Sequence, residues 1–153
     1  MLFQKINQSD ADKVFITCKN GSTSRIAVGT PVCFDTLTDA NGNTVILAST
    51  VGLRLFAGIV ADRIMGTSGQ PDQYQKVQCY GWNNAIMMGA TTVTPGIAMQ
   101  VGNALTYMRP AILHGASTAE DIDETYAYVV AGTTYNTPSE TYISTVRGFI
   151  RAM

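Results

Sequence analysis

Short runs of β-favouring residues, separated by Gly, Pro, Asn and Asp, recur along the whole chain. Apolar residues at the three-to-four spacing of an amphipathic helix are almost absent. Brief apolar runs that alternate with turn residues are typical of sheet proteins. The pattern predicts an all-β protein, folded as a compact antiparallel β-barrel or a jelly-roll-like sandwich.

The strands expected from these runs span residues 14–18, 31–35, 44–48, 53–61, 75–81, 85–88, 96–101, 104–108, 125–131 and 142–152. The clearest hairpin signal is Asn41-Gly42, because this pair tolerates positive φ angles between two β-prone runs. Thr94-Pro95-Gly96 has the composition of a type II turn. Residues 117–120 have the spacing of a capping box, so at most one short helix is expected, near residues 117–124.

A chain of 153 residues can bury a sizeable core as one domain. We expect an N-terminal arm over residues 1–12 and a single β domain over residues 13–153. Residues 62–73, DRIMGTSGQPDQ, are the most loop-like stretch and predict an exposed connection. Two segments resemble each other loosely, AVGTPVCFD and VTPGIAMQVG, but the match is too short to indicate a duplication.

Charged side chains are scarce. They make up 14% of the chain, against about 25% in an ordinary soluble domain. So few charges cannot solvate the whole surface, and we expect other subunits to cover part of it. The net charge is −1 and the basic residues are scattered, which removes the main driving force for nucleic-acid binding. No membrane span or signal peptide is recognisable, so a soluble protein without membrane partners is expected.

Groups of tunable reactivity are few. His114 is the only histidine, and without a G-x-S-x-G elbow or a similar signature it is interpreted as a surface or loop residue. Cys18, Cys33 and Cys79 form no C-x-x-C pair and are interpreted as buried small hydrophobes. Zinc-binding and phosphate-cradling motifs are missing. The chain is therefore predicted not to be an enzyme, and no catalytic, cofactor or metal site is assigned.

Two groups of oxygen-bearing side chains could imitate a site. The first surrounds a turn and lacks the closing acid of a calcium loop, so turn chemistry explains it better than a weak cation site. The second could supply a carboxylate pair for glycoside hydrolysis, but acids gathered in one polar loop are usually a solvated helix cap. The first group is Asp35, Asp39, Asn41 and Asn43, and the second is Glu120, Asp121, Asp123 and Glu124.

Three motifs follow one another in the first three-fifths of the chain: GTPVCFD, LFAGIVAD and VQCYGWNNA. In this order they resemble the small decoration, or cement, proteins of tailed-phage capsids. The closing TVRGFIRAM is similar in style to the final strand of such proteins. Each motif also has an architectural interpretation, in which Gly29 and Pro31 begin a strand, Gly58 allows close packing or a bulge, and Gly81 ends a strand.

The resemblance implies a homotrimer on the outer surface of the virion, made in the host cytoplasm, which bridges major capsid proteins and stabilises the phage head. No cofactor is implied. The capsid or subunit interface is expected to include Leu2, Phe3 and Ile6 of the arm together with Tyr80 and Trp82. An alternative function is open for the aromatic pair, which with Asn83 and Asn84 would suit sugar binding in a head-fibre or tail-associated β module.

Overall fold

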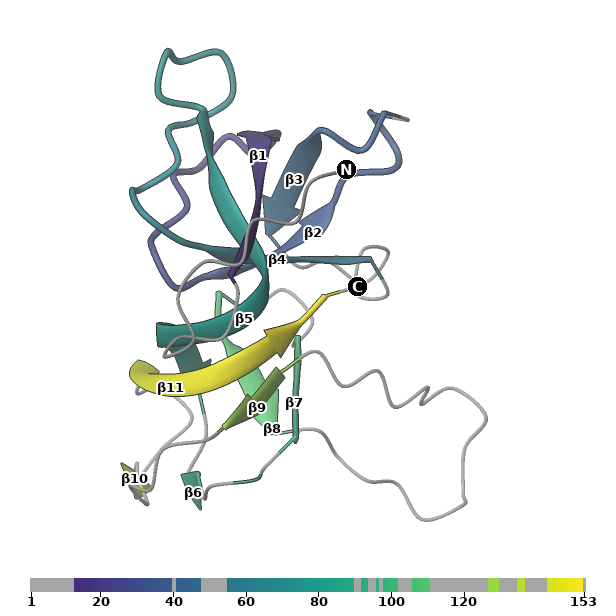
Figure 1. Ribbon diagram of the computed structural model, residues 1–153. Coiled ribbons are helices and arrows are strands. Elements are labelled where there is room, and N and C mark those ends of the chain that lie inside the picture. Colours follow the sequence, from purple (N-terminus) through teal and green to yellow (C-terminus); the bar gives the residue numbers. More distant parts are fainter. Residues whose placement is uncertain are drawn as a thin grey trace, which may run out of the picture.

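The computed structural model describes residues 13–39, 41–47, 55–89, 92–93, 96, 98–101, 106–110, 127–129, 135–136 and 143–152. Within these ranges the chain forms strands and no helix, which confirms the predicted all-β class (Figure 1). The expected arm at residues 1–12 and the helix expected near residues 117–124 lie outside the described residues. The strands are β1 (Val14–Asn20), β2 (Pro31–Phe34), β3 (Thr44–Leu47), β4 (Phe56–Val60), β5 (Tyr74–Gly89), β6 (Thr92–Val93), β7 (Ala98–Val101), β8 (Met108–Pro110), β9 (Ala127–Val129), β10 (Tyr135–Asn136) and β11 (Ile143–Arg151).

Nine of these strands form one sheet in the order β1-β3-β2-β4-β5-β11-β9-β7-β8, while β6 pairs with β10 separately. β5 also pairs with β1 and with β8, so the sheet returns to β5 twice. Each return closes a circuit of five strands. We call them the N-terminal circuit (β1, β3, β2, β4, β5) and the C-terminal circuit (β5, β11, β9, β7, β8).

The sheet is mixed, whereas an antiparallel one was predicted. Most pairings are antiparallel, but β1–β3 and β5–β8 are parallel. Closure of the circuits explains the difference. Five antiparallel steps would bring the starting strand back in the reversed direction, so a circuit of five strands needs a parallel step.

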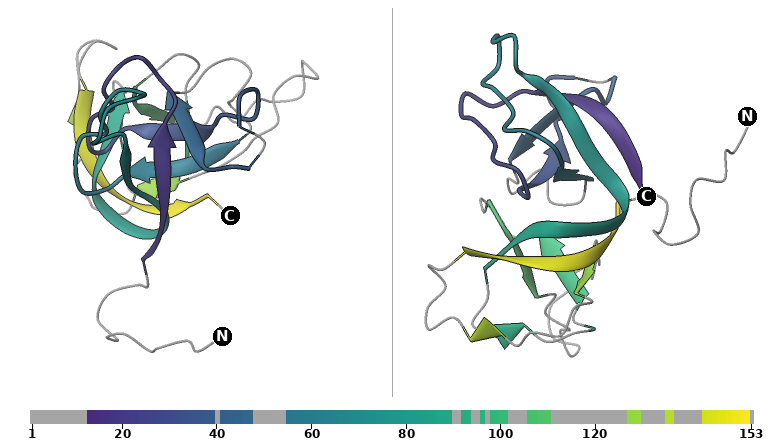
Figure 2. Two further views of the ribbon diagram at one scale, coloured as in Figure 1. Left: turned by 90° about the horizontal axis from the view of Figure 1, so that it is seen from above. Right: turned by 60° about the vertical axis from the view of Figure 1, so that its left-hand side comes forward.

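The two circuits have the same connectivity. In chain order, the first strand of each pairs in parallel with the third and antiparallel with the fifth, while the fourth pairs with the second and the fifth. β5 is the fifth strand of one circuit and the first of the other (Figure 2). The loosely similar segments of the sequence supply β2 and β7, which are the second strands of their circuits. Their likeness therefore coincides with equivalent places in the fold.

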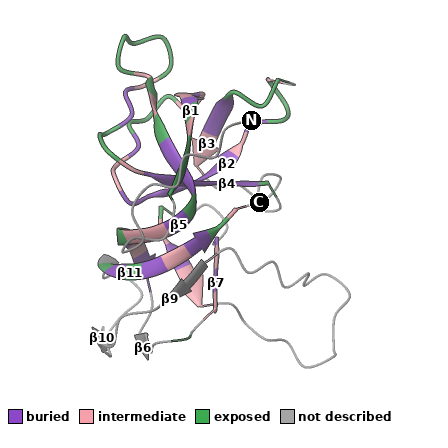
Figure 3. Ribbon diagram, viewed as in Figure 1, coloured by how far each residue is buried: buried purple, intermediate pink, exposed green. Residues whose placement is uncertain are grey.

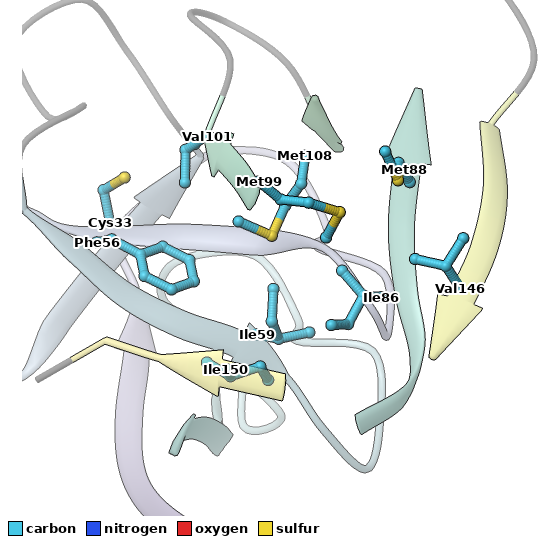
Figure 4. Close-up of a cluster of buried hydrophobic side chains, with 10 residues drawn as sticks. All are labelled: Cys33, Phe56, Ile59, Ile86, Met88, Met99, Val101, Met108, Val146 and Ile150. Carbon is cyan, nitrogen blue, oxygen red and sulfur yellow. The ribbon is translucent and has the colours of Figure 1, made fainter. Parts of the chain in front are cut away.

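Buried apolar side chains form two clusters. Figure 3 marks the buried positions along the strands of both circuits. The N-terminal core consists of Cys18, Ile26, Val32, Val45, Ala57, Val60, Met65 and Val77. The C-terminal core, drawn in Figure 4, consists of Cys33, Phe56, Ile59, Ile86, Met88, Met99, Val101, Met108, Val146 and Ile150.

β4 lies between the two cores, and all five of its residues are buried. Ala57 and Val60 belong to the N-terminal core, whereas Phe56 and Ile59 belong to the C-terminal core. Burial of one Ile or Phe side chain contributes about 1.5–3 kcal/mol, so both faces of this strand stabilise the fold. Burial on both faces explains why FAGIV is a continuous apolar run without alternating polar residues.

β5 is longer than predicted. The expected strands 75–81 and 85–88 are parts of one strand of 16 residues. Gly81 was expected to end a strand, but it lies inside β5 with φ of 96°. Around this glycine β5 leaves β1 and β4 and continues along β11, as the right-hand view of Figure 2 shows. Glycine adopts positive φ without a Cβ penalty, so the strand bends there instead of ending.

The other glycine predictions are confirmed. Gly29 has φ of 85° just before β2 begins at Pro31, and Gly42 has φ of 69° in the turn between β2 and β3. Gly58 pairs with Val32 beside a register shift between β2 and β4. A Cβ at Gly58 would lie 2.2 Å from the carbonyl oxygen of Gln78, so the close approach of β4 to β5 requires glycine.

One expected strand was misplaced, and two short strands were missed. The strand expected at residues 104–108 is instead β8, which begins at Met108. The two-residue strands β6 and β10 were not predicted, because two residues show no periodicity. The connection at residues 62–73 is a mostly exposed loop, as predicted, but it is not exposed at Met65. Met65 is fully buried and exchanges two backbone hydrogen bonds with Ile26, which anchors this connection to the N-terminal core.

Candidate functional site

The three cysteines lie in β1, β2 and β5 as free, buried thiols. This confirms their interpretation as small hydrophobes. Burial raises the pKa of the Cys18 thiol to about 11, with a further rise from nearby Cys79. Burial raises the pKa of Cys33 to about 12 and also raises that of Cys79. At neutral pH the three thiols are protonated, so they act by packing.

Asp35 and Asp39 organise the turn between β2 and β3. Asp35 accepts hydrogen bonds from the amides of Leu37 and Thr38, each at 3.2 Å. Asp39 accepts them from the Asn41 amide at 2.9 Å and from the Thr44 hydroxyl at 2.6 Å. Turn chemistry therefore explains these carboxylates, as predicted. His114 and the acids at residues 120–124 lie outside the described residues, within which no three His, Cys, Asp or Glu side chains are grouped as metal ligands.

A polar hollow lies beside this turn, at the end of the N-terminal circuit. Its lining includes Thr17, Lys19, Asp39, Asn43 and Tyr74. The carboxylate of Asp39 is engaged by the turn, and this lowers its pKa from the ordinary value, chiefly through the Thr44 hydroxyl. The Asp39 carboxylate in this hollow therefore already has hydrogen-bond partners within the turn.

Tyr80 and Trp82, the two aromatic residues singled out in the sequence, are brought together by a third ring. Phe149 of β11 packs edge-to-face against both, with centroid distances of 5.0 Å to Tyr80 and 5.3 Å to Trp82. Such pairs contribute about 0.5–1.5 kcal/mol beyond the area they bury. We call Tyr80, Trp82 and Phe149 the aromatic patch.

The aromatic patch lies on the outer face of the sheet. Its neighbours in β11, Val146 and Ile150, belong to the C-terminal core, and residues alternate between the two faces of a strand. Tyr80 is 37% exposed. At the start of β1, exposed Val14 pairs with Tyr80, and exposed Phe15 follows it. Apolar surface therefore continues from the aromatic patch onto β1.

Three exposed cations surround this surface: Lys13, Arg147 and Arg151, which we call the basic rim. The guanidinium carbon of Arg147 lies 5.4 Å from the centre of the Trp82 ring, at cation–π distance. Arg151 pairs with Tyr80 across the sheet, and Lys13 immediately precedes β1. Among the described residues none of the three forms an ion pair.

A buried amide holds the bend of β5 beneath the aromatic patch. Gln78 is only 2% exposed and donates through Nε2 to the carbonyl oxygens of Tyr80 and Trp82, each at 3.0 Å. Its Oε1 accepts from Asn83 Nδ2 at 3.1 Å, and Asn83 Oδ1 accepts from the amide of Ala85. Asn83, a candidate for sugar binding, is therefore engaged in the backbone of the bend.

The expected interface residues Leu2, Phe3 and Ile6 lie outside the described residues. The described chain nevertheless starts at the aromatic patch, because Lys13 leads into Val14 opposite Tyr80. Beyond Tyr80 the same edge of β5 is occupied by β11. Lys13, the residue that follows the expected arm in sequence, therefore lies beside the aromatic patch.

Sequence reasoning missed Phe149, Arg147 and Gln78. The alternation in TVRGFIRAM could have indicated the first two, since it places Arg147, Phe149 and Arg151 on one strand face opposite Val146 and Ile150. No sequence signal marks Gln78, because its role depends on the bend at Gly81.

No protein-family model, curated protein or solved structure matches this chain. The resemblance to capsid decoration proteins therefore depends on the motifs of the chain itself. In the described part of the chain, no helix has the length and apolar character needed to cross a membrane.

Proposed function

We propose that the chain is a capsid decoration protein, which assembles as a homotrimer on the outside of a phage head and bridges major capsid proteins. The observation that carries this proposal is the aromatic patch: three rings on the outer face of two paired strands, continued by exposed apolar residues of β1. Exposed aromatic and arginine side chains on a rigid scaffold are the composition of protein interfaces.

The three motifs of the resemblance give further support. GTPVCFD forms β2, LFAGIVAD forms β4, and VQCYGWNNA forms the bend of β5. These three strands are consecutive neighbours in the sheet. The motifs therefore build one continuous part of the scaffold, which ends in the strand that carries Tyr80 and Trp82.

The scarcity of charge agrees with a protein whose surface is covered in an assembly. In the proposed function the arm, with Leu2, Phe3 and Ile6, contacts the capsid, and the aromatic patch contacts a neighbouring copy. A trimer then has three attachment points. Release of one leaves the others holding the protein close to the shell, so dissociation is slow.

The sugar-binding alternative uses the same aromatic residues. Arg147 lies over the Trp82 ring, and Asn83 is engaged in the bend, so fewer of the cluster's groups are free for a sugar. The geometry therefore favours an interface between proteins.

The test is co-sedimentation of the purified protein with shells of the phage that encodes it. The full chain should bind to saturation, and deletion of residues 1–12 should abolish binding while circular dichroism shows an unchanged fold. Trp82→Ala should weaken binding at least about tenfold, because loss of the contact between copies leaves each copy with a single attachment point. Tyr74→Ala is the matched control, since Tyr74 is an exposed aromatic at the far end of β5.

Full shell occupancy by the truncated chain would refute the role of the arm. Virions that lack the protein would refute the proposed function. Glycan-array binding by the full chain, lost in Trp82→Ala, would favour the sugar-binding module instead.

A further inference from the structure

The aromatic patch is surrounded by positive charge and is partly exposed in a single copy, since Tyr80 is exposed while Trp82 and Phe149 are half-buried. Arg147, Arg151 and Lys13 are exposed around it, as are Val14 and Phe15. Two copies that packed this surface on itself about a two-fold axis would bring like charges together, which is unfavourable. A partner must instead bring carboxylates along with an apolar side chain.

The acidic side chains among the described residues are poorly placed to pair with the basic rim. Asp35 and Asp39 accept the hydrogen bonds of their own turn, and Asp62 is 3.6 Å from Lys76. These residues and Asp72 lie in the β2–β3 and β4–β5 connections. Both connections extend toward the top of Figure 1, away from β11. Any carboxylates that the chain itself supplies to the aromatic patch must come from elsewhere in the sequence.

One segment has the required composition. Residues 120–124, Glu-Asp-Ile-Asp-Glu, place four carboxylates around a single apolar residue, Ile122. It is the densest group of acids in the chain. Its charge is opposite to that of the basic rim, and charge complementarity of this kind steers association and fixes its register.

We infer that the aromatic patch of one copy binds the segment 120–124 of a second copy. Ile122 packs against the rings, and the carboxylates pair with Arg147, Arg151 and Lys13. The contact joins two different surfaces of the same chain, so it is head-to-tail and closes a ring when the rotation between copies permits. The inference deepens the self-assembly part of the proposed function, since it names the surfaces through which a trimer would form.

The test is a charge exchange followed by sedimentation velocity. One variant carries Arg147→Glu and Arg151→Glu, a second carries Asp121→Lys and Glu124→Lys, and a third carries all four changes. Each of the first two should weaken association at least about tenfold, and the third should restore it to within about threefold of the wild type, as for compensating charges across an interface. Arg25→Glu with Arg63→Glu is the matched control, since both side chains are exposed outside the basic rim.

A second measurement uses a peptide of residues 117–126 as the probe. Trp82 is the only tryptophan of the chain, so its fluorescence reports directly on the aromatic patch. Saturable binding is expected, with loss of the signal when Gln and Asn replace the acids of the peptide. Thermal unfolding of every variant checks that each one remains folded.

The inference would be overturned if the charge-reversed variants kept the oligomer mass of the wild type. It would also be overturned if the variant with all four changes were folded but remained dissociated. A third contrary result would be charge-reversed variants that change only the midpoint of thermal unfolding. The last result would mean that the segment contacts its own copy. Shell binding of the same variants separates the two proposals. If the charge exchange fails to restore association but shells are still decorated, the inference is refuted and the proposed function is not. If the charge exchange restores association but the protein does not bind shells, the proposed function is refuted and the inference is not.

Discussion

The N-terminal and C-terminal circuits share one pairing scheme but have different interiors. The N-terminal core contains four valines and one methionine, whereas the C-terminal core contains two valines and three methionines, Met88, Met99 and Met108. Valine has few side-chain conformations, and methionine has three rotatable bonds that adapt to irregular gaps. One arrangement of strands therefore accommodates a core rich in valine and a core rich in methionine, and we expect the second to be the more adaptable.

Buried polar contacts reinforce the contrast. In the N-terminal circuit Asn20 is fully buried, and its Nδ2 donates to the carbonyl oxygens of Ser24 and Gly66, each at 2.8 Å. Its Oδ1 accepts from the Ser22 amide. These directional bonds tie the end of β1 to two connections, while the C-terminal core is held by apolar packing. Substitutions should therefore have different costs in the two circuits.

The largest effect is expected where β4 passes close to β5, the strand that both circuits share. Gly58→Ala places a Cβ against the Gln78 carbonyl at positive φ, so it should lower the free energy of unfolding by about 4 kcal/mol. Both circuits should lose stability together in urea unfolding. Gly42→Ala is the control, since it also has positive φ but open space around it, and should cost about 1 kcal/mol. Equal costs for the two would contradict the close approach of β4 and β5.

A core rich in methionine should tolerate a change of side-chain shape better than a loss of volume. Met99→Ala should cost about 3 kcal/mol, because it leaves a cavity at a fully buried site, whereas Met99→Leu should cost less than about 1.5 kcal/mol. Denaturant titration of both variants measures the difference. A penalty for Leu as large as that for Ala would show that this core is as stiff as the N-terminal one.

The polar contact of the N-terminal circuit should contribute somewhat less. Asn20→Ala leaves two carbonyls and one amide without their partner, which should cost about 2 kcal/mol. Hydrogen exchange should speed up around Gly66 before it changes in the C-terminal circuit. The exposed Asn84→Ala serves as the control and should leave both readouts unchanged.

The smallest effect concerns acid and the β2–β3 turn. The Thr44 hydroxyl and neighbouring amides hold the pKa of Asp39 below its ordinary value. The ionised form is thus favoured by folding, so its contribution is present above the unfolded pKa of about 3.9 and is lost as pH falls through the lower folded value. The thermal midpoint of the wild type should slightly exceed that of Asp39→Asn at neutral pH, and the two should converge in acid. A gap that widens on acidification would contradict this direction.

The sequence predicted the all-β class because period-two runs and turn residues report on local geometry. It also predicted the roles of Gly29, Gly42 and Gly58 correctly, since each role follows from the residues that flank the glycine in the sequence. It failed at Gly81, because a glycine that ends a strand and one that bends it have the same local pattern. The candidate site was likewise predictable only where it depends on residues close together in the sequence. Tyr80 and Trp82 were recognisable as neighbours in sequence, but Phe149 reaches them only through the pairing of β11 with β5.

The meeting of two strand ends at Tyr80 has an engineering consequence. β1 begins and β11 finishes opposite this residue on one edge of β5, where the amide of Ala152 donates to the carbonyl of Cys79 at 2.9 Å. A short linker from Ala152 to Lys13 could therefore join them without disturbing the sheet. A circular permutant opened at Asn41-Gly42, in an exposed turn, would keep the described strand pairings and move the new termini away from the aromatic patch.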